Sequence, residues 1–379
     1  MLEQRFIDLA RQMMPIPTAA FHEHFVLAAV EKFAHEIRGI SCSRDEFGNV
    51  TLLYDGQPEG KHKRGFLLAT AHLDHPGMGF PQRISKRNFS FEKLGGVDIA
   101  KVVDSTVKIY SPHLPVDQSP YKGKIISPIP SKGASPAKFK VRVEKSASSA
   151  ITPQSFAVWD LPLFKRKGRF IHGRACDDLA GVAVGLAYLE EVSRRRLPII
   201  AGLLLTRAEE IGFGGMLAAA QAKSLPNQAL FVNIECSSSR AGAPLGNGPV
   251  IRVGDRWRIF DPFVTGGLVA LAEELAAKNP NFCFQRKLMD GGICEATVLA
   301  NAGFRTGAVA LPLANYHNAG KKKLKAEIVH LDDALNLIAL LVHLASHSSN
   351  IDQTLNQAQK HLEKRLVTHR HLVESRLST

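Results

Sequence analysis

Apolar positions recur with two different periods along this chain. Near the N-terminus, Leu2, Phe6, Leu9 and Met13 recur at helical spacing up to the first proline, and a second helix is expected after Thr18. Farther on, short apolar runs predict strands over 49–54, 65–71, 199–206, 229–234, 249–253, 282–288 and 307–311. Helical periods between them predict helices over 179–194, 214–222, 263–278, 294–302 and 331–345. This alternation is typical of a layered α/β domain.

The segment 81–167 interrupts the alternation. It holds short β-branched runs, such as 101–110 and 139–143, with turn-rich spacers between them, and nine of the twenty prolines. It also carries sixteen Lys and Arg against six Asp and Glu, whereas the rest of the chain has 32 basic and 29 acidic residues. The pattern predicts a small, basic, β-rich module inserted into the α/β domain.

The composition is that of a core-forming chain. With 379 residues, 45% hydrophobic and 22% charged, the chain is too apolar for disorder as its main state and long enough for two units. Its longest apolar stretch, 335–345, is about half of what a bilayer requires. The N-terminus lacks the apolar centre of a signal peptide, and the five cysteines show no CxxC spacing. We therefore expect reduced thiols, a cytoplasmic location and no membrane partner.

Chemistry-bearing side chains gather where the predicted strands end. The motifs are AHLDH (71–75), GRACDDLAG (173–181), AEEIGFGG (208–215), NIEC (233–236) and ANYHN (314–318). Open α/β sheets place their active sites at the carboxyl ends of the strands. Together the motifs supply what a two-cation site requires: a bridging carboxylate, terminal His and carboxylate ligands, and a free acid that deprotonates a water.

Each motif alone also has a structural explanation. His-x-Asp is common by chance, paired Asp residues before a helix serve as N-caps, and the acids at 209 and 210 fit a solvated turn. Glu235 closes a strand that is expected to be buried, so its carboxylate requires a partner. Cys176 and Cys236 adjoin acidic residues, and we interpret them as small buried hydrophobes rather than nucleophiles.

Taken in order, and with GPVIRVGD (248–255), these motifs resemble the co-catalytic zinc peptidases of the glutamyl and TET aminopeptidase family over roughly residues 1–348. That family carries a small PDZ-like β domain between its first His ligand and its bridging Asp, and here those positions are 105 residues apart. The resemblance implies a three-layer αβα zinc-exopeptidase-like catalytic domain (1–80 and 168–348), the inserted β domain (81–167) and a C-terminal helical extension (349–379).

The resemblance also implies two divalent metal ions per chain. The expected metal is zinc, and cobalt or manganese are the alternatives. Asp177 would bridge the ions, and the terminal ligands would be His72 and Glu235 on one ion and Glu210 and His317 on the other. Glu209 would be the general base that takes a proton from a bridging water, and Asp74 would orient His72. The implied activity is aminopeptidase hydrolysis of peptides.

Three positions depart from the family pattern. Glu235 stands where Asp is usual, His75 stands where Glu is usual, and residues 291–296 read Gly-Gly-Ile-Cys-Glu-Ala in place of Gly-Thr-Asp-Ala. Glu at position 235 is commoner in related carboxypeptidases and deacylases. A carboxypeptidase or N-deacylase on the same scaffold therefore stays open, as does a non-catalytic basic binding module.

The expected partners are a peptide substrate and further copies of this chain, bound through the inserted domain, and no nucleic acid. The lysine-rich segment 319–326 predicts a solvated loop. Beyond residue 349, Leu355, Leu362 and Leu366 lie near one face of a predicted amphipathic helix.

Overall fold

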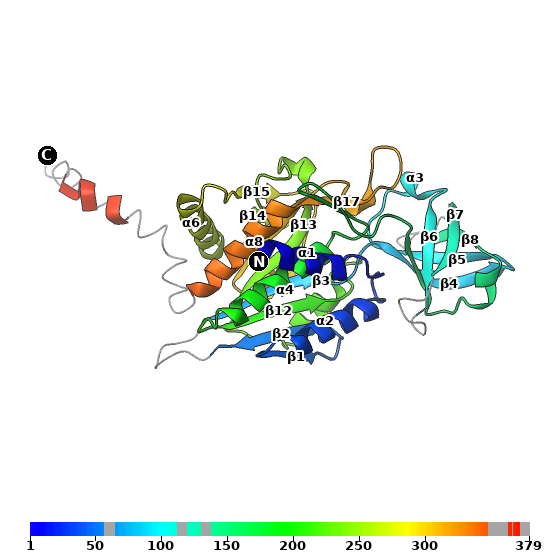
Figure 1. Ribbon diagram of the computed structural model, residues 1–379, viewed down its shortest axis with the longest axis horizontal. Coiled ribbons are helices and arrows are strands. Elements are labelled where there is room, and N and C mark those ends of the chain that lie inside the picture. The colour runs from blue at the N-terminus through cyan, green and yellow to red at the C-terminus, as the bar shows by residue number, and fades with distance from the viewer. Residues whose placement is uncertain (57–64, 112–119, 130–137, 348–362, 366, 372–379) are drawn as a thin grey trace.

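The computed structural model describes residues 1–56, 65–111, 120–129, 138–347, 363–365 and 367–371. Its main feature is an eight-stranded mixed sheet (Figure 1). In spatial order the strands are β1 (Ile40–Arg44), β2 (Val50–Asp55), β12 (Ile200–Thr206), β3 (Phe66–His72), β13 (Leu230–Ser238), β16 (Thr306–Leu313), β14 (Val250–Asp255) and β15 (Gln285–Met289). The central strands β12, β3, β13 and β16 are parallel to one another, so their carboxyl ends share one edge.

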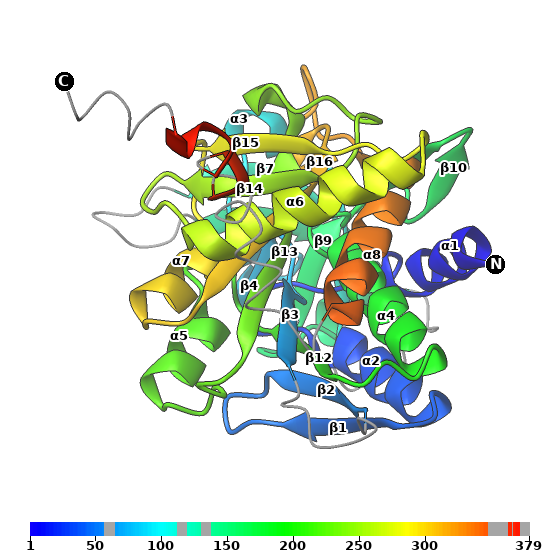
Figure 2. The same cartoon turned by 90° about the vertical axis from the view of Figure 1, so that its left-hand side faces the viewer.

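Alternate side chains of the central strands face two separate apolar layers, as the period of two in a strand requires. Leu67 and Ala69 of β3 pack in the larger core, whereas Leu68 packs in a smaller one. The helices of the larger core are α1 (Leu2–Met13), α2 (His24–Glu36), α4 (Leu179–Arg194), α6 (Pro262–Lys278) and α8 (Leu331–Ser346). The smaller core involves α5 (Gly214–Gln221) and α7 (Glu295–Asn301). Helices therefore cover both faces of the sheet (Figure 2).

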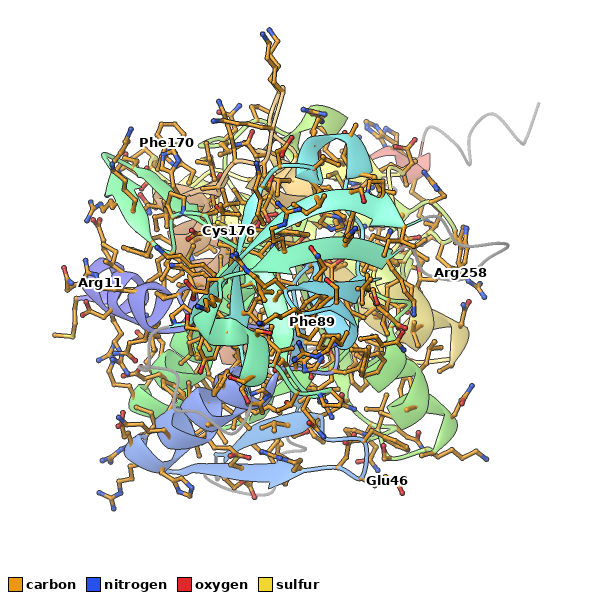
Figure 3. The ribbon with its side chains drawn as sticks, turned by 90° about the vertical axis from the view of Figure 1, so that its right-hand side faces the viewer. Arg11, Glu46, Phe89, Phe170, Cys176 and Arg258 are labelled. Carbon is orange, nitrogen blue, oxygen red and sulfur yellow. The ribbon has the colours of Figure 1, made fainter. Side chains whose placement is uncertain are left out.

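The interrupting segment forms a closed six-stranded barrel that projects from one end of the molecule (Figure 1). Its strands in spatial order are β4 (Gly77–Ser85), β5 (Asn88–Leu94), β8 (Lys138–Val143), β7 (Tyr121–Ile129), β6 (Thr106–Tyr110) and β9 (Phe156–Trp159). The barrel encloses its own apolar core, which includes Phe89 (Figure 3). The short elements α3 (Ile99–Val102) and η1 (Ser146–Ser149) accompany it. The PDZ-like character and the domain boundaries stay predictions.

A three-stranded sheet lies outside the barrel. It is formed by β10 (Lys165–Lys167), β11 (Phe170–Gly173) and β17 (Glu327–His330), and it leads the chain into the 173–181 motif. The lysine-rich segment before β17 is partly anchored, because Leu324 packs in the core of the barrel. The leucines of the predicted C-terminal helix lie outside the described residues. Within the described part of the chain, no helix is both long enough and apolar enough to span a membrane.

Candidate metal centre

The predicted ligands meet at the shared edge where the central strands end, as expected for an open parallel sheet. The motif residues come from five places in the chain: His72 ends β3, Glu209 and Glu210 follow β12, Glu235 lies in β13, His317 lies in the short helix η3 (Tyr316–Asn318) after β16, and Asp177 precedes α4. The peptide bond between Asp177 and Asp178 is cis.

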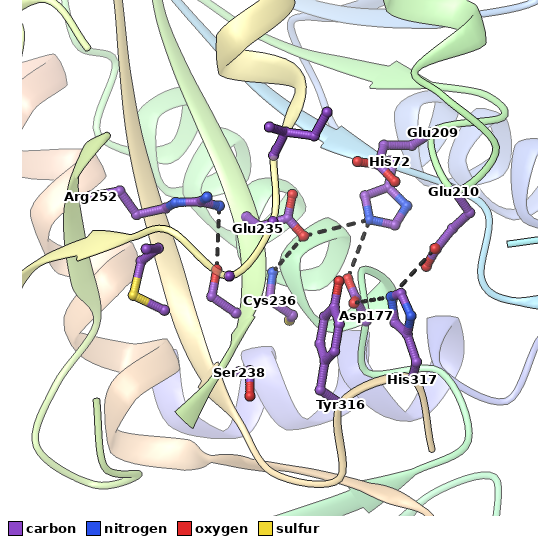
Figure 4. Close-up of a pocket in the computed structure, with 15 residues that line it drawn as sticks. His72, Asp177, Glu209, Glu210, Glu235, Cys236, Ser238, Arg252, Tyr316 and His317 are labelled. Atoms are coloured by element: carbon purple, nitrogen blue, oxygen red, sulfur yellow. Dashed lines mark hydrogen bonds and ion pairs between the residues drawn. The ribbon is translucent and has the colours of Figure 1, made fainter. Parts of the chain in front are cut away.

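Asp177 lies at the middle of the cluster, and each of its carboxylate oxygens faces a different histidine (Figure 4). Oδ1 is 3.3 Å from Nε2 of His72, and Oδ2 is 3.6 Å from Nε2 of His317. Nε2 of His72 is also 3.8 Å from Oε1 of Glu235, and Nε2 of His317 is 3.4 Å from Oε2 of Glu210. The two histidines therefore head two groups of side chains that share one carboxylate.

These side chains fit divalent cations. His72, Asp177 and Glu235 form one group with ligand atoms within 4.8 Å of one another, and Asp177, Glu210 and His317 form a second. Glu209 joins His72 and Glu210 in a third group, so it lies beside both. Oδ1 of Asp177 and Oε1 of Glu210 are buried without a hydrogen-bond partner. Buried carboxylates in such numbers require a compensating positive charge.

The electrostatics agree with this requirement. Burial raises the pKa of Asp177 to about 7, against a partial opposing effect of the neighbouring His72. Burial also raises the pKa of Glu209 and of Glu210 well above the usual carboxyl range, and neighbouring carboxylates add to the effect on both. Without a cation these groups therefore hold protons that a bound metal would displace.

Asp74 supports the Glu209–Glu210 turn directly. Its carboxylate oxygens accept hydrogen bonds from the backbone N–H groups of Glu209 (2.9 Å) and Glu210 (3.1 Å). Toward His72, the closest contact is from Nδ1 to the backbone carbonyl of Asp74 at 3.1 Å, whereas the carboxylate lies 3.7 Å from Nδ1. The carboxylate of Asp74 therefore hydrogen-bonds to the backbone N–H groups of the two glutamates. Its contact with His72, which it was predicted to orient, is longer.

Glu327, which lies in none of the sequence motifs, holds the loop that carries Asp177. Its buried Oε2 accepts hydrogen bonds from the backbone N–H groups of Cys176 (2.8 Å) and Asp177 (3.0 Å), and its Oε1 accepts one from Asn318 (3.4 Å). One side chain on β17 thus ties Asp177 to the segment that carries His317. The only sequence signal is an acidic residue directly before the apolar pair Ile328 and Val329.

His75 is occupied by contacts within the chain. One ring nitrogen lies against the backbone carbonyl of Asp177, and the other is 2.9 Å from Oδ1 of Asn318. Neither nitrogen is left for a metal ion. The thiols of Cys176 and Cys236 are buried, and burial raises the pKa of both well above the ordinary thiol range, so they stay protonated.

A pocket of about 280 Å³ opens onto the cluster. Besides the predicted site residues, its lining includes Cys236, Ser237, Ser238, Arg252, Met289, Gly291, Gly292, Ile293 and Tyr316 (Figure 4). Arg252 is buried, donates a hydrogen bond from Nη1 to Oγ of Ser237 (3.3 Å) and has no partner for Nε. The pocket thus combines the carboxylate cluster with one buried cation.

An α/β sheet with two candidate ligand groups at its edge fits a metal-dependent hydrolase. The profile of the M42 glutamyl aminopeptidase family matches residues 48–340. The chain belongs to this family and is a hydrolytic exopeptidase.

Solved structures share the fold at low sequence identity. An aminopeptidase from the archaeon Desulfurococcus kamchatkensis superposes with a TM-score of 0.74 at 20% identity, covering 94% of this chain and 98% of its own. A TET aminopeptidase from a marine sediment archaeon of the Thaumarchaeota gives 0.74 at 18%, with coverages of 93% and 99%. The TET1 peptidase of Pyrococcus horikoshii gives 0.71 at 20%, with coverages of 90% and 99%.

Proposed function

We propose that this chain is a two-metal aminopeptidase. The observation that carries the proposal is the Asp177 carboxylate, whose two oxygens face His72 and His317 separately. Asp177 would be shared by the two ions, His72 and Glu235 would hold one of them, and Glu210 and His317 would hold the other. Zinc suits this mixture of imidazole and carboxylate ligands, and cobalt or manganese are the alternatives.

Bound cations would polarise the scissile carbonyl and lower the pKa of a bound water. Glu209 takes the proton of the attacking water, since it lines the pocket beside both ligand groups. The same carboxyl then donates the proton to the departing amine. Asp74 keeps Glu209 and Glu210 in register through their backbone N–H groups.

Arg252 supports a preference for an acidic side chain on the substrate. Its buried guanidinium reaches the pocket wall and lacks a full set of partners, so a carboxylate that enters the pocket gains a charge-assisted hydrogen bond. This agrees with the glutamyl activity for which the family is described. The same cation also fits the C-terminal carboxylate of a peptide, which keeps a carboxypeptidase as the second candidate, together with Glu235.

One peptide in three forms separates these candidates: free, N-acetylated and C-amidated. Products are identified by mass spectrometry after incubation with the metal-loaded protein. We expect stepwise loss of N-terminal residues from the free and C-amidated forms and no cleavage of the N-acetylated form. Cleavage of the N-acetylated peptide that C-amidation abolishes would refute the aminopeptidase proposal in favour of a carboxypeptidase. Release of acetate alone would indicate a deacylase.

We also propose that the chain forms a homo-oligomer with contacts from the inserted barrel. The TET1 peptidase of Pyrococcus horikoshii is described as assembling into a tetrahedron or an octahedral shell. Exposed apolar side chains just after β14, Trp257 and Ile259, offer further contact surface. Light scattering coupled to size-exclusion chromatography tests this, and a monomer at every concentration would refute it. The cytoplasmic location stays a prediction.

A further inference from the structure

Three metal-ligating side chains meet where α6 and α8 pack together, outside the candidate metal centre. Glu274 lies in the last turns of α6, while His343 and His347 lie one helical turn apart at the end of α8. Their ligand atoms lie within 4.8 Å of one another. Nε2 of His343 is 3.4 Å from Oε2 of Glu274, which is longer than a strong hydrogen bond.

The tautomer of His347 leaves one nitrogen ready for a metal. Nδ1 of His347 lies 2.8 Å from the backbone carbonyl oxygen of His343. Since a carbonyl only accepts, Nδ1 carries a proton and donates it, which leaves Nε2 as the ring nitrogen that a metal ion can use. Histidines that bind metals commonly donate their other N–H to a backbone carbonyl in this way. His343 and His347 also pack edge to face, with ring centroids 4.4 Å apart.

The neighbouring charge is compatible with a cation. Lys278 pairs with Oε1 of Glu274 at 2.5 Å, whereas Oε2 is the oxygen that faces His343. One carboxylate oxygen thus stays available while the other keeps its ion pair. The C-terminal ends of both helices carry partial negative charge, which favours a cation near them. Nε2 of His343 is buried and has no hydrogen-bond partner, which leaves it available to a cation.

We propose that Glu274, His343 and His347 bind one divalent transition-metal ion, with zinc as the fitting cation, in a site separate from the Asp177 cluster. Two imidazoles and one carboxylate are a ligand set that zinc uses with water in the fourth position. Because the ligands come from two helices, the ion links the end of α6 to the end of α8 and holds the chain where it leaves α8.

The experiment counts zinc on the full-length protein that carries its catalytic ions. Wild type, His347→Gln and Glu274→Gln are dialysed against buffered Zn²⁺, and bound zinc is measured by inductively coupled plasma mass spectrometry. We expect each variant to bind one ion fewer per chain and to keep the kcat/KM of the wild type. Loss of one ligand weakens the site at least about 10- to 100-fold. The control is His35→Gln, a substitution of an exposed histidine on α2, which should keep the wild-type count.

Anomalous diffraction at the zinc edge on wild-type crystals soaked in Zn²⁺ decides the location without any substitution. A peak among Glu274, His343 and His347 is expected. Wild-type zinc counts in both variants, or no peak at this position in the map, would overturn the proposal. If a variant loses more than one ion, the presence or absence of this wild-type peak decides the question. The zinc count and the anomalous peak are independent of the aminopeptidase proposal, because neither uses peptide cleavage; only the kcat/KM comparison does.

Discussion

Asp74→Asn tests how the acids of the candidate metal centre are held in place. The side chain is fully buried, and its two oxygens accept the backbone N–H groups of Glu209 and Glu210. In the variant, an NH₂ group replaces one oxygen and cannot accept. One backbone N–H is then buried against another donor, although the shape of the side chain is unchanged.

The expected cost follows from these contacts. Loss of one hydrogen bond to a charged acceptor lowers the free energy of unfolding by about 1.5 to 3 kcal/mol. The carboxylate of Asp74 also repels the buried Glu23. Because the substitution removes this repulsion, the expected loss of unfolding free energy lies near the lower end of that range, at about 1.5 to 2 kcal/mol. The assay is urea unfolding of the metal-stripped protein, so that bound ions add nothing by mass action.

Asp261→Asn is the matched control. One oxygen of Asp261 accepts both Phe263 N (2.9 Å) and Val264 N (3.0 Å) at the start of α6. Since Asn retains such an oxygen and caps helices about as well as Asp, the change should be only a few tenths of a kcal/mol. Equal stability of the two variants would contradict the role of Asp74 as the acceptor of these two N–H groups. Unchanged stability of Asp74→Asn with weakened zinc binding would show that Asp74 acts through His72.

Three further predictions concern catalysis, metal binding and specificity. Glu209→Gln should keep both metal ions and lower kcat by about 10²- to 10⁴-fold, whereas Glu210→Gln should lose metal. Full activity in Glu209→Gln would contradict the assigned base. Because the pKa of Asp177 is raised to about 7, protons compete with the cation, and metal content at fixed free zinc should fall from about pH 8 to about pH 6. A flat profile would argue against Asp177 as a ligand. Arg252→Met should lower kcat/KM for N-terminal Glu about tenfold or more relative to N-terminal Leu, as one charge-assisted hydrogen bond is lost. Equal losses for both substrates would remove Arg252 from specificity.

The local pattern predicted the elements of the α/β part well, because periodicity reports which face of an element is buried. The expected strand over 199–206 is β12, and the expected helix over 179–194 is α4 with the same bounds. Strand β1 was missed, since its residues are mostly exposed and show little alternation. The predicted strand over 282–288 lies at 285–289, at the sheet edge where burial is weakest.

The meeting of the candidate ligands at strand ends was likewise readable, since parallel strands bring their carboxyl ends to one edge. The supporting contacts were not. Glu327 is 150 residues from Asp177 along the chain, and no local pattern predicts that its carboxylate accepts that backbone N–H. Arg252 appears in the sequence as an ordinary strand residue, and only packing shows that its guanidinium lines the pocket.

The α/β class, the inserted β segment and the inventory of histidines and carboxylates follow from the amino-acid sequence alone, because they depend on periodicity and residue chemistry. Only the packed molecule shows which of those groups meet. The two oxygens of Asp177 face two histidines, Asp74 accepts hydrogen bonds from the backbone of Glu209 and Glu210, and Glu274 lies beside His343. Such contacts depend on which strands and helices become neighbours. The burial of apolar side chains from the whole chain decides this, and no local sequence pattern does.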